Sequence, residues 1–139
     1  MMTTTAKKTW SNTEYENHGN IMYDIGKQSA FQSIMKTEVI WSVNLSDKFK
    51  HWDLDTVILG DGNLKDITFV NKILTDDLDE KGDFVPQIIT SKAKNATVKE
   101  VWLAAERTYK IAKEEYEDWH KYLERVILYN GVIYSVFGS

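Results

Sequence analysis

Glu117 and His120 stand three residues apart in the stretch EEYEDWHKYLER (114–125), the spacing at which some helical bundles bind iron or zinc. A di-metal bundle also needs a second Glu-x-x-His pair and further glutamate-bearing helices, and the sequence shows only one strong helical pattern. Lys113 lies four residues before Glu117, at ion-pair spacing on a helix. We therefore interpret the stretch as a solvent-facing helix surface. We expect no metal and no cofactor, with Glu117 and His120 as the pair whose spacing would suit a metal.

Other motifs for chemistry are incomplete. Asp53-x-Asp55 has the spacing of a phosphatase nucleophile motif, but the residues before it, KFKHW, do not read as a buried strand. The Asp77-x-Asp79 stretch lacks the oxygen ligands that a calcium loop needs at its fifth and twelfth positions. No Gly-x-Ser-x-Gly elbow and no cysteine nucleophile is present. The sequence therefore favours a protein that is not an enzyme.

Size and composition indicate one ordinary globular domain over residues 1–139, within which residues 1–19 form a polar arm. Cysteine is absent, which fits a reducing compartment. We find neither an apolar run of membrane-spanning length nor a hydrophobic signal core. We therefore expect a cytoplasmic protein that does not bind a membrane.

Acidic residues concentrate in the middle of the chain. Residues 51–90 hold three Lys/Arg against nine Asp/Glu, a net charge of −6, whereas residues 1–50 and 91–139 each carry +1. This distribution argues against direct nucleic-acid binding, which needs a basic surface. One interpretation is a solvated loop. The other is a patch that docks on a basic partner, formed by Asp76, Asp77, Asp79, Glu80 and Asp83.

The clearest predicted element is a long amphipathic helix over about 98–128. Thr97-Val-Lys-Glu100 is a capping box, and apolar residues then recur every three or four positions as far as Val126. Asn130-Gly131 would end this helix, and a strand would follow at 132–137. The alternative is a hairpin around the same dipeptide, which is also the strongest hairpin signal.

The remaining elements are shorter. We expect strands at 20–26 and 36–45, a short helix at 46–53 and an edge strand at 83–90 containing Pro86. Residues 64–80 fit either a helix or a strand, and the spacing of their apolar residues favours a helix. The predicted fold is α+β: a small, mainly antiparallel sheet packed on one long C-terminal helix, with one or two short helices.

Four aromatic residues of the predicted helix fall on one side of it: Trp102, Tyr109, Tyr116 and Trp119. The first interpretation is that these rings pack across the sheet. The second is that some of them anchor an interface or line a pocket, because Tyr and Trp are enriched at binding hot spots.

These observations favour a non-catalytic protein-interaction protein. It would be either a small acidic inhibitor or immunity-type factor that binds a basic partner, or a structural subunit that self-assembles into a homo-oligomer. Both would suit a small phage or mobile-element product. The alternative is a small-ligand-binding protein or small enzyme with an aromatic pocket between helix and sheet.

If the chain self-assembles through its polar arm, deletion of residues 1–19 should reduce its solution mass to that of one copy. Light scattering on the full and truncated proteins measures this. An unchanged mass would reject the arm as the means of assembly.

Overall fold

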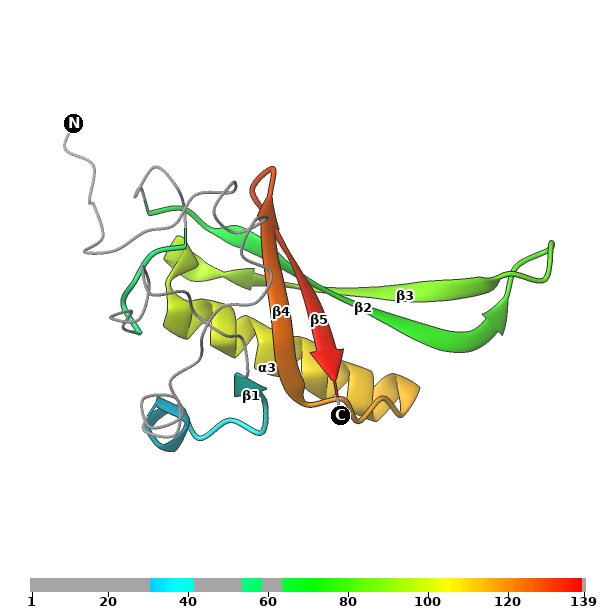
Figure 1. The fold of residues 1–139 in the computed structure, drawn as a ribbon, viewed down its shortest axis with the longest axis horizontal. Helices are drawn as coiled ribbons and strands as arrows, with labels where there is room; N and C mark the ends of the chain where they lie inside the picture. Colours follow the sequence, from blue (N-terminus) through cyan, green and yellow to red (C-terminus); the bar gives the residue numbers. More distant parts are fainter. Residues whose placement is uncertain (1–30, 42–53, 59–63, 139) are drawn as a thin grey trace.

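The computed structural model describes residues 31–41, 54–58 and 64–138, and it shows one sheet with a long helix on one face (Figure 1). The predicted arm 1–19, strand 20–26 and helix 46–53 lie outside these residues. Residues 31–35 are helical. The named elements, in chain order, are β1 (Ile40–Trp41), β2 (Ile67–Leu78), β3 (Phe84–Ala93), the 3₁₀ turn η2 (Lys94–Ala96), α3 (Val98–Tyr116), β4 (Tyr122–Tyr129) and β5 (Val132–Gly138).

The sheet is mixed. Its five described strands lie in the order β1-β4-β5-β2-β3. The β1–β4 and β2–β5 pairs are parallel, whereas the β2–β3 and β4–β5 pairs are antiparallel. A sheet packed on one long helix is therefore confirmed, and the prediction of a mainly antiparallel sheet is wrong. Residues 36–41 of the predicted strand 36–45 are described, and only the two residues of β1 form a strand there.

Strand β2 occupies most of residues 64–80, so the prediction of a helix there is wrong. The buried positions alternate through Ile67, Phe69, Asn71 and Ile73. In the sequence, Asn71 interrupts the period-2 pattern of apolar residues, because this core position holds a polar side chain. Its side-chain amide reaches the Thr108 hydroxyl of α3 at 3.5 Å. Leu74 and Leu78 lie on the exposed face of the strand. Counted together with the buried residues in the sequence, they gave the apolar positions an apparent helical spacing.

Helix α3 begins as predicted. The Thr97 hydroxyl accepts a hydrogen bond from the Glu100 amide at 3.2 Å. The amides of Val98 and Lys99 donate to the carbonyls of residues 56 and 54. Segment 54–58 therefore supplies acceptors for first-turn amides that have no partner within the helix.

The helix ends at Tyr116, so the predicted end near 128 is wrong. Glu117 adopts a left-handed conformation (φ 57°, ψ 31°) and turns the chain toward β4. Leu123 and Val126 are buried, but on a strand. A bulge between Leu123 and Arg125 inserts one extra residue in β4. Buried residues therefore stand three apart along this strand, which imitates helical spacing.

The Asn130-Gly131 dipeptide is a hairpin turn between β4 and β5, so the helix-cap interpretation is wrong and the hairpin alternative is confirmed. Both residues have positive φ (51° and 74°), as a type I′ hairpin turn requires. The predicted final strand is present as β5.

Strand β3 lies at the edge of the described sheet, as Pro86 indicated. Pro86 offers no N–H to a further strand. Arg107 of α3 reaches over the same strand, where its Nη2 donates to the Lys92 carbonyl at 2.6 Å and its Nε to the Ser91 hydroxyl at 2.7 Å.

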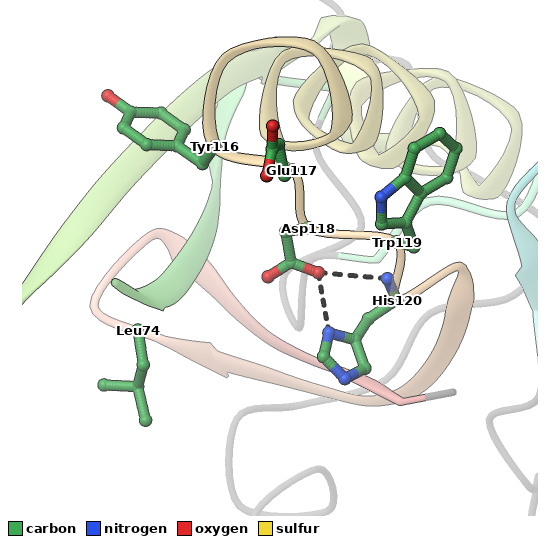
Figure 2. A pocket seen from close by; sticks show the side chains of 6 residues that line it. All are labelled: Leu74, Tyr116, Glu117, Asp118, Trp119 and His120. Carbon is green, nitrogen blue, oxygen red and sulfur yellow. Dashed lines mark hydrogen bonds and ion pairs between the residues drawn. The ribbon is translucent and has the colours of Figure 1, made fainter. Parts of the chain in front are cut away.

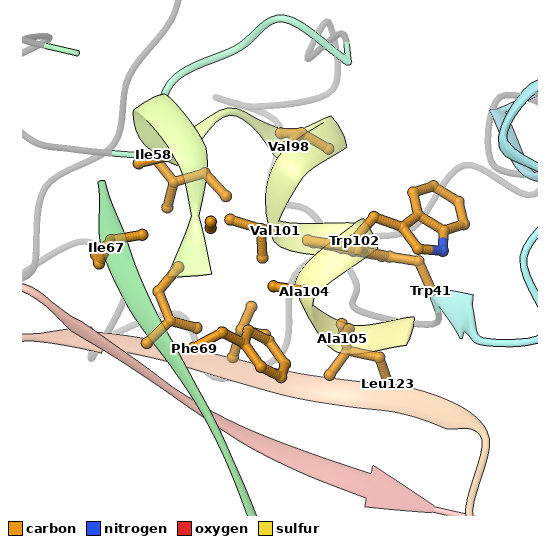
Figure 3. Close-up of a cluster of buried hydrophobic side chains, with 14 of the residues drawn as sticks. Trp41, Ile58, Ile67, Phe69, Val98, Val101, Trp102, Ala104, Ala105 and Leu123 are labelled. Atoms are coloured by element: carbon orange, nitrogen blue, oxygen red, sulfur yellow. The ribbon is translucent and has the colours of Figure 1, made fainter. Parts of the chain in front are cut away.

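The core lies between α3 and the sheet (Figure 3). Trp102 of α3 and Trp41 of β1 are fully buried with ring centroids 5.6 Å apart, and the Trp102 indole N–H donates to the Val39 carbonyl at 3.2 Å. Small residues at Ala104 and Ala105 let the helix approach the sheet closely. In the described part of the chain, no helix has both the length and the apolar character to cross a membrane.

The Glu106 carboxylate fastens the segment before β1 to the helix. It accepts hydrogen bonds from the Glu38 amide at 3.0 and 3.1 Å and from the Val39 amide at 2.9 Å, while Lys110 lies 3.8 Å away. Because a buried carboxylate needs such donors, the contact fixes the position of this segment.

We predict that Glu106→Gln lowers the free energy of unfolding by about 1.5–3 kcal/mol, the range for hydrogen bonds to a charged group. Urea unfolding measures this. Glu115→Gln, at an exposed position of the same helix, is the matched control. Equal effects of the two substitutions would show that the Glu106 carboxylate is not a stabilising contact.

Candidate functional site

The β2–β3 hairpin extends past the end of α3 (Figure 1). Ile73 and Ile89 of its proximal half pack on Ala112 near the end of the helix. Beyond these residues the hairpin loses two supports. Strand β5 pairs with β2 only as far as Asn71, and the helix stops at Tyr116. Within the described residues, the distal hairpin is therefore a two-stranded ribbon, which has little stability of its own in water.

The outer face of this ribbon is apolar. Opposed residues of an antiparallel pair share a face, and Leu74 opposes Pro86 while Leu78 opposes Phe84. Phe84, Pro86 and Ile88 alternate along β3 and so share that face too. It is the face opposite the one that carries Ile73 and Ile89. We call its four large exposed side chains, which are 57–77% exposed, the apolar face: Leu74, Leu78, Phe84 and Ile88.

The acidic patch predicted from sequence lies at the tip of the hairpin and beside the apolar face. Asp79 holds the turn, because its Oδ1 accepts from the amides of Lys81 at 2.8 Å and Asp83 at 3.0 Å. The side chains of Asp77, Glu80 and Asp83 are exposed. Asp76 lies in the same strand end. The tip therefore presents negative charge, and the Asp79 carboxylate also stabilises the turn.

A pocket lies at the base of the distal hairpin, where loop 117–121 passes strand β2 (Figure 2). Its volume is about 320 Å³, and it is lined by Leu74, Tyr116, Glu117, Asp118, Trp119 and His120. A smaller hollow of about 220 Å³ shares Leu74, Asp118 and His120 and extends along β2 to Asn71. Leu74 belongs to both the pocket lining and the apolar face, so the two surfaces meet at this residue.

Asp118 and His120 point toward one another and stiffen the loop (Figure 2). The Asp118 Oδ1 accepts from the His120 amide at 3.0 Å and lies 2.6 Å from its Nδ1. Because a carboxylate only accepts, Nδ1 carries the proton in this contact. Among the described residues, His120 has no hydrogen bond to a serine or threonine hydroxyl, so the pair lacks the contact of a nucleophilic triad there.

Lys113 positions the Trp119 ring. Its Nζ lies 5.4 Å from the centroid of that ring and 5.3 Å from the Tyr109 ring, and it forms an ion pair with Glu38 at 2.9 Å. The Lys113 ammonium holds the pKa of the Glu38 carboxyl below its ordinary value, and hydrogen bonding to Glu38 raises the pKa of Lys113. The pair therefore stabilises the fold at neutral pH, and this contribution is lost as the pH falls through the lowered pKa of Glu38.

The four aromatic residues singled out in the sequence separate into two groups. Trp102 and Tyr109 are buried in the core, where Tyr109 has a raised pKa because of burial. Tyr116 ends the helix, and Trp119, which is 66% exposed, stands in the loop beyond it; both line the pocket. Two of the four aromatic residues therefore belong to the core, and two line the pocket at the end of the helix.

Glu117 and His120 both line the pocket, but they do not form a metal cluster. In the part of the chain that the structure describes, no group of three or more His, Cys, Asp or Glu side chains could hold a metal ion. Both residues lie in a loop, so the helical spacing that suggested a metal pair does not exist.

Sequence reasoning missed the apolar face. Phe84 and Ile88 were placed in an edge strand, and Leu74 and Leu78 were counted toward a helix. The alternation of Phe84, Pro86 and Ile88 was the part of this face visible in the sequence, and Leu74 and Leu78 join it only through the β2–β3 register.

Comparison with protein-family models, with curated proteins and with solved structures finds no match to this chain.

Glu117 occupies a left-handed position that favours glycine. We predict that Glu117→Gly raises the free energy of unfolding by about 0.5–1 kcal/mol, because the relief of the left-handed penalty exceeds the entropy that glycine adds to the unfolded chain. Glu117→Ala, which removes the carboxylate and keeps the Cβ atom, should give no such gain in thermal or urea unfolding. Equal stabilities of the two variants would contradict the prediction.

Proposed function

We propose that this is a non-catalytic interaction protein that docks its β2–β3 hairpin on a basic protein partner. The observation that carries the proposal is the apolar face, four large side chains exposed together on a ribbon whose tip is acidic. Contiguous exposed apolar surface of this kind is typical of interfaces, because covering it removes it from water.

The two parts of the hairpin would have different tasks in binding. Leu74, Phe84 and their neighbours would form the desolvated centre of the interface, where most binding free energy is usually concentrated. Asp77, Glu80 and Asp83 would lie at its rim. Their charge would speed association with a basic surface and oppose wrong partners more than it would add affinity.

The charge of the tip favours a different protein over a second copy of this chain. A two-fold interface brings the same patch of both copies together, so two acidic tips would approach one another. Self-assembly through residues 1–19 is a separate hypothesis, and those residues lie outside the described ranges. A cytoplasmic partner is part of the proposal, supported by the absence of cysteine.

The proposal predicts that two sets of hairpin substitutions weaken partner binding in different ways. Leu78→Ser with Phe84→Ser should weaken it by about tenfold or more at every salt concentration, because the interface centre is lost. Asp77→Asn with Glu80→Gln and Asp83→Asn should weaken it mainly at low salt and flatten its salt dependence. The measurement is capture of partners by the immobilised full chain, followed by titration of the captured protein.

The controls separate the hairpin from the rest of the surface. Ile34→Ser removes an equally exposed apolar side chain, and Glu115→Gln an exposed charge, both away from the hairpin. Asp79 is left unchanged because it holds the turn. Binding that survives both hairpin variants, or that is lost equally in the controls, would reject the proposal. A concentration-dependent dimer abolished by the Leu78 and Phe84 substitutions would replace it with self-association.

A further inference from the structure

We infer that the pocket beside Leu74 receives a cationic side chain, an arginine in particular, from the docked partner. This inference rests on the proposed function for the origin of the arginine, but not for the chemistry of the pocket. Leu74 belongs to the pocket lining and to the apolar face, so a partner docked on that face would lie next to the pocket.

The volume of the pocket suits one side chain. At about 320 Å³ it lies at the small end of the range of about 300–1,000 Å³ for pockets that bind small molecules. Tyr116, Trp119 and Leu74 supply flat or aliphatic surface, against which the stem of a long side chain can pack. Trp119 is two-thirds exposed, so its ring offers a surface for such a contact.

The polar groups of the pocket favour a cation. Glu117 and Asp118 are both acidic, and the Oδ1 of Asp118 is already engaged by His120. The Glu117 carboxylate has no hydrogen bond or ion pair to any other described residue, so it is free to accept. A guanidinium group fits this combination, because it stacks on aromatic faces and donates two parallel hydrogen bonds to a carboxylate.

The protein already uses the Trp119 ring to hold a cation. Lys113 lies over this ring while its charge is paired with Glu38. The indole of Trp119 is the strongest kind of side-chain partner for a cation–π contact. Lys72 lines the smaller hollow, so the cation of the partner would be placed on the Glu117 side.

The identity of residue 117 is consistent with a task for its carboxylate. The chain places a glutamate at a left-handed position where glycine would relieve the backbone. Glu117 therefore costs stability at the position where it contributes a carboxylate to the pocket.

The test uses the full chain and a small probe, so it does not depend on finding the partner. The Trp119 indole N–H signal of the ¹⁵N-labelled protein, assigned by its loss in Trp119→Phe, is followed during titration with N-acetyl-arginine amide. We expect a saturable shift. N-acetyl-citrulline amide, which has nearly the same shape and no charge, should give none. In Glu117→Gln the apparent affinity for the arginine probe should fall about tenfold, because a charge-assisted contact is lost.

Glu114→Gln, which removes a neighbouring exposed charge outside the pocket, is the matched control and should leave binding of the probe unchanged. Equal shifts with the arginine and citrulline probes, a shift that does not saturate, or an unchanged affinity in Glu117→Gln would each overturn the inference. If the probe binds but the hairpin variants do not affect partner capture, the proposed docking fails and the pocket stands. If partner capture needs the hairpin and the probe does not bind, the pocket inference alone fails.

Discussion

The position of the first described strand depends on one buried carboxylate. Glu106 accepts hydrogen bonds from two consecutive backbone amides, those of Glu38 and Val39, and so ties the strand segment 38–41 to α3. Strand β1 is only two residues long, and its pairing with β4 alone is too short to fix it. Any arrangement that removed this segment would leave the buried carboxylate without its two amide donors and with only the Lys110 ammonium, 3.8 Å away, beside it. Glu106 therefore fixes the position of β1, whereas β4 is held by its long antiparallel pairing with β5.

The end of α3 determines both candidate surfaces. Among the described residues, the last part of the hairpin has no helix beneath it, because α3 stops at Tyr116, and no third strand beside it, because β5 pairs with β2 only as far as Asn71. The same termination sends loop 117–121 across β2, which forms the pocket. A helix continuing to residue 128, as the sequence pattern indicated, would have provided a longer cover for the hairpin. The backbone turn at Glu117 thus ends the helical cover of the hairpin within the described residues and places the pocket at its base.

Local chemistry made part of this fold predictable. The Thr97 cap, the Pro86 edge strand and the Asn130-Gly131 turn each depend on one or two residues and their neighbours, and all three signals were present in the sequence. The two largest errors came from positions where tertiary contacts override a pattern. Asn71 is a polar residue in the core of β2, and the bulge after Leu123 shifts the buried residues of β4 to a spacing of three. For the site, the acidic tip was evident from composition, whereas the apolar face required the β2–β3 register.

Strand β3 combines an exposed apolar side-chain face with a backbone edge that is blocked at two positions. Pro86 withholds a donor, and Arg107 occupies the carbonyl of Lys92. An apolar ribbon with an open edge would be a template on which further copies could add as strands, the first step toward fibres. Blocking these two positions makes strand addition by further copies less favourable, while the apolar side chains of β3 stay exposed.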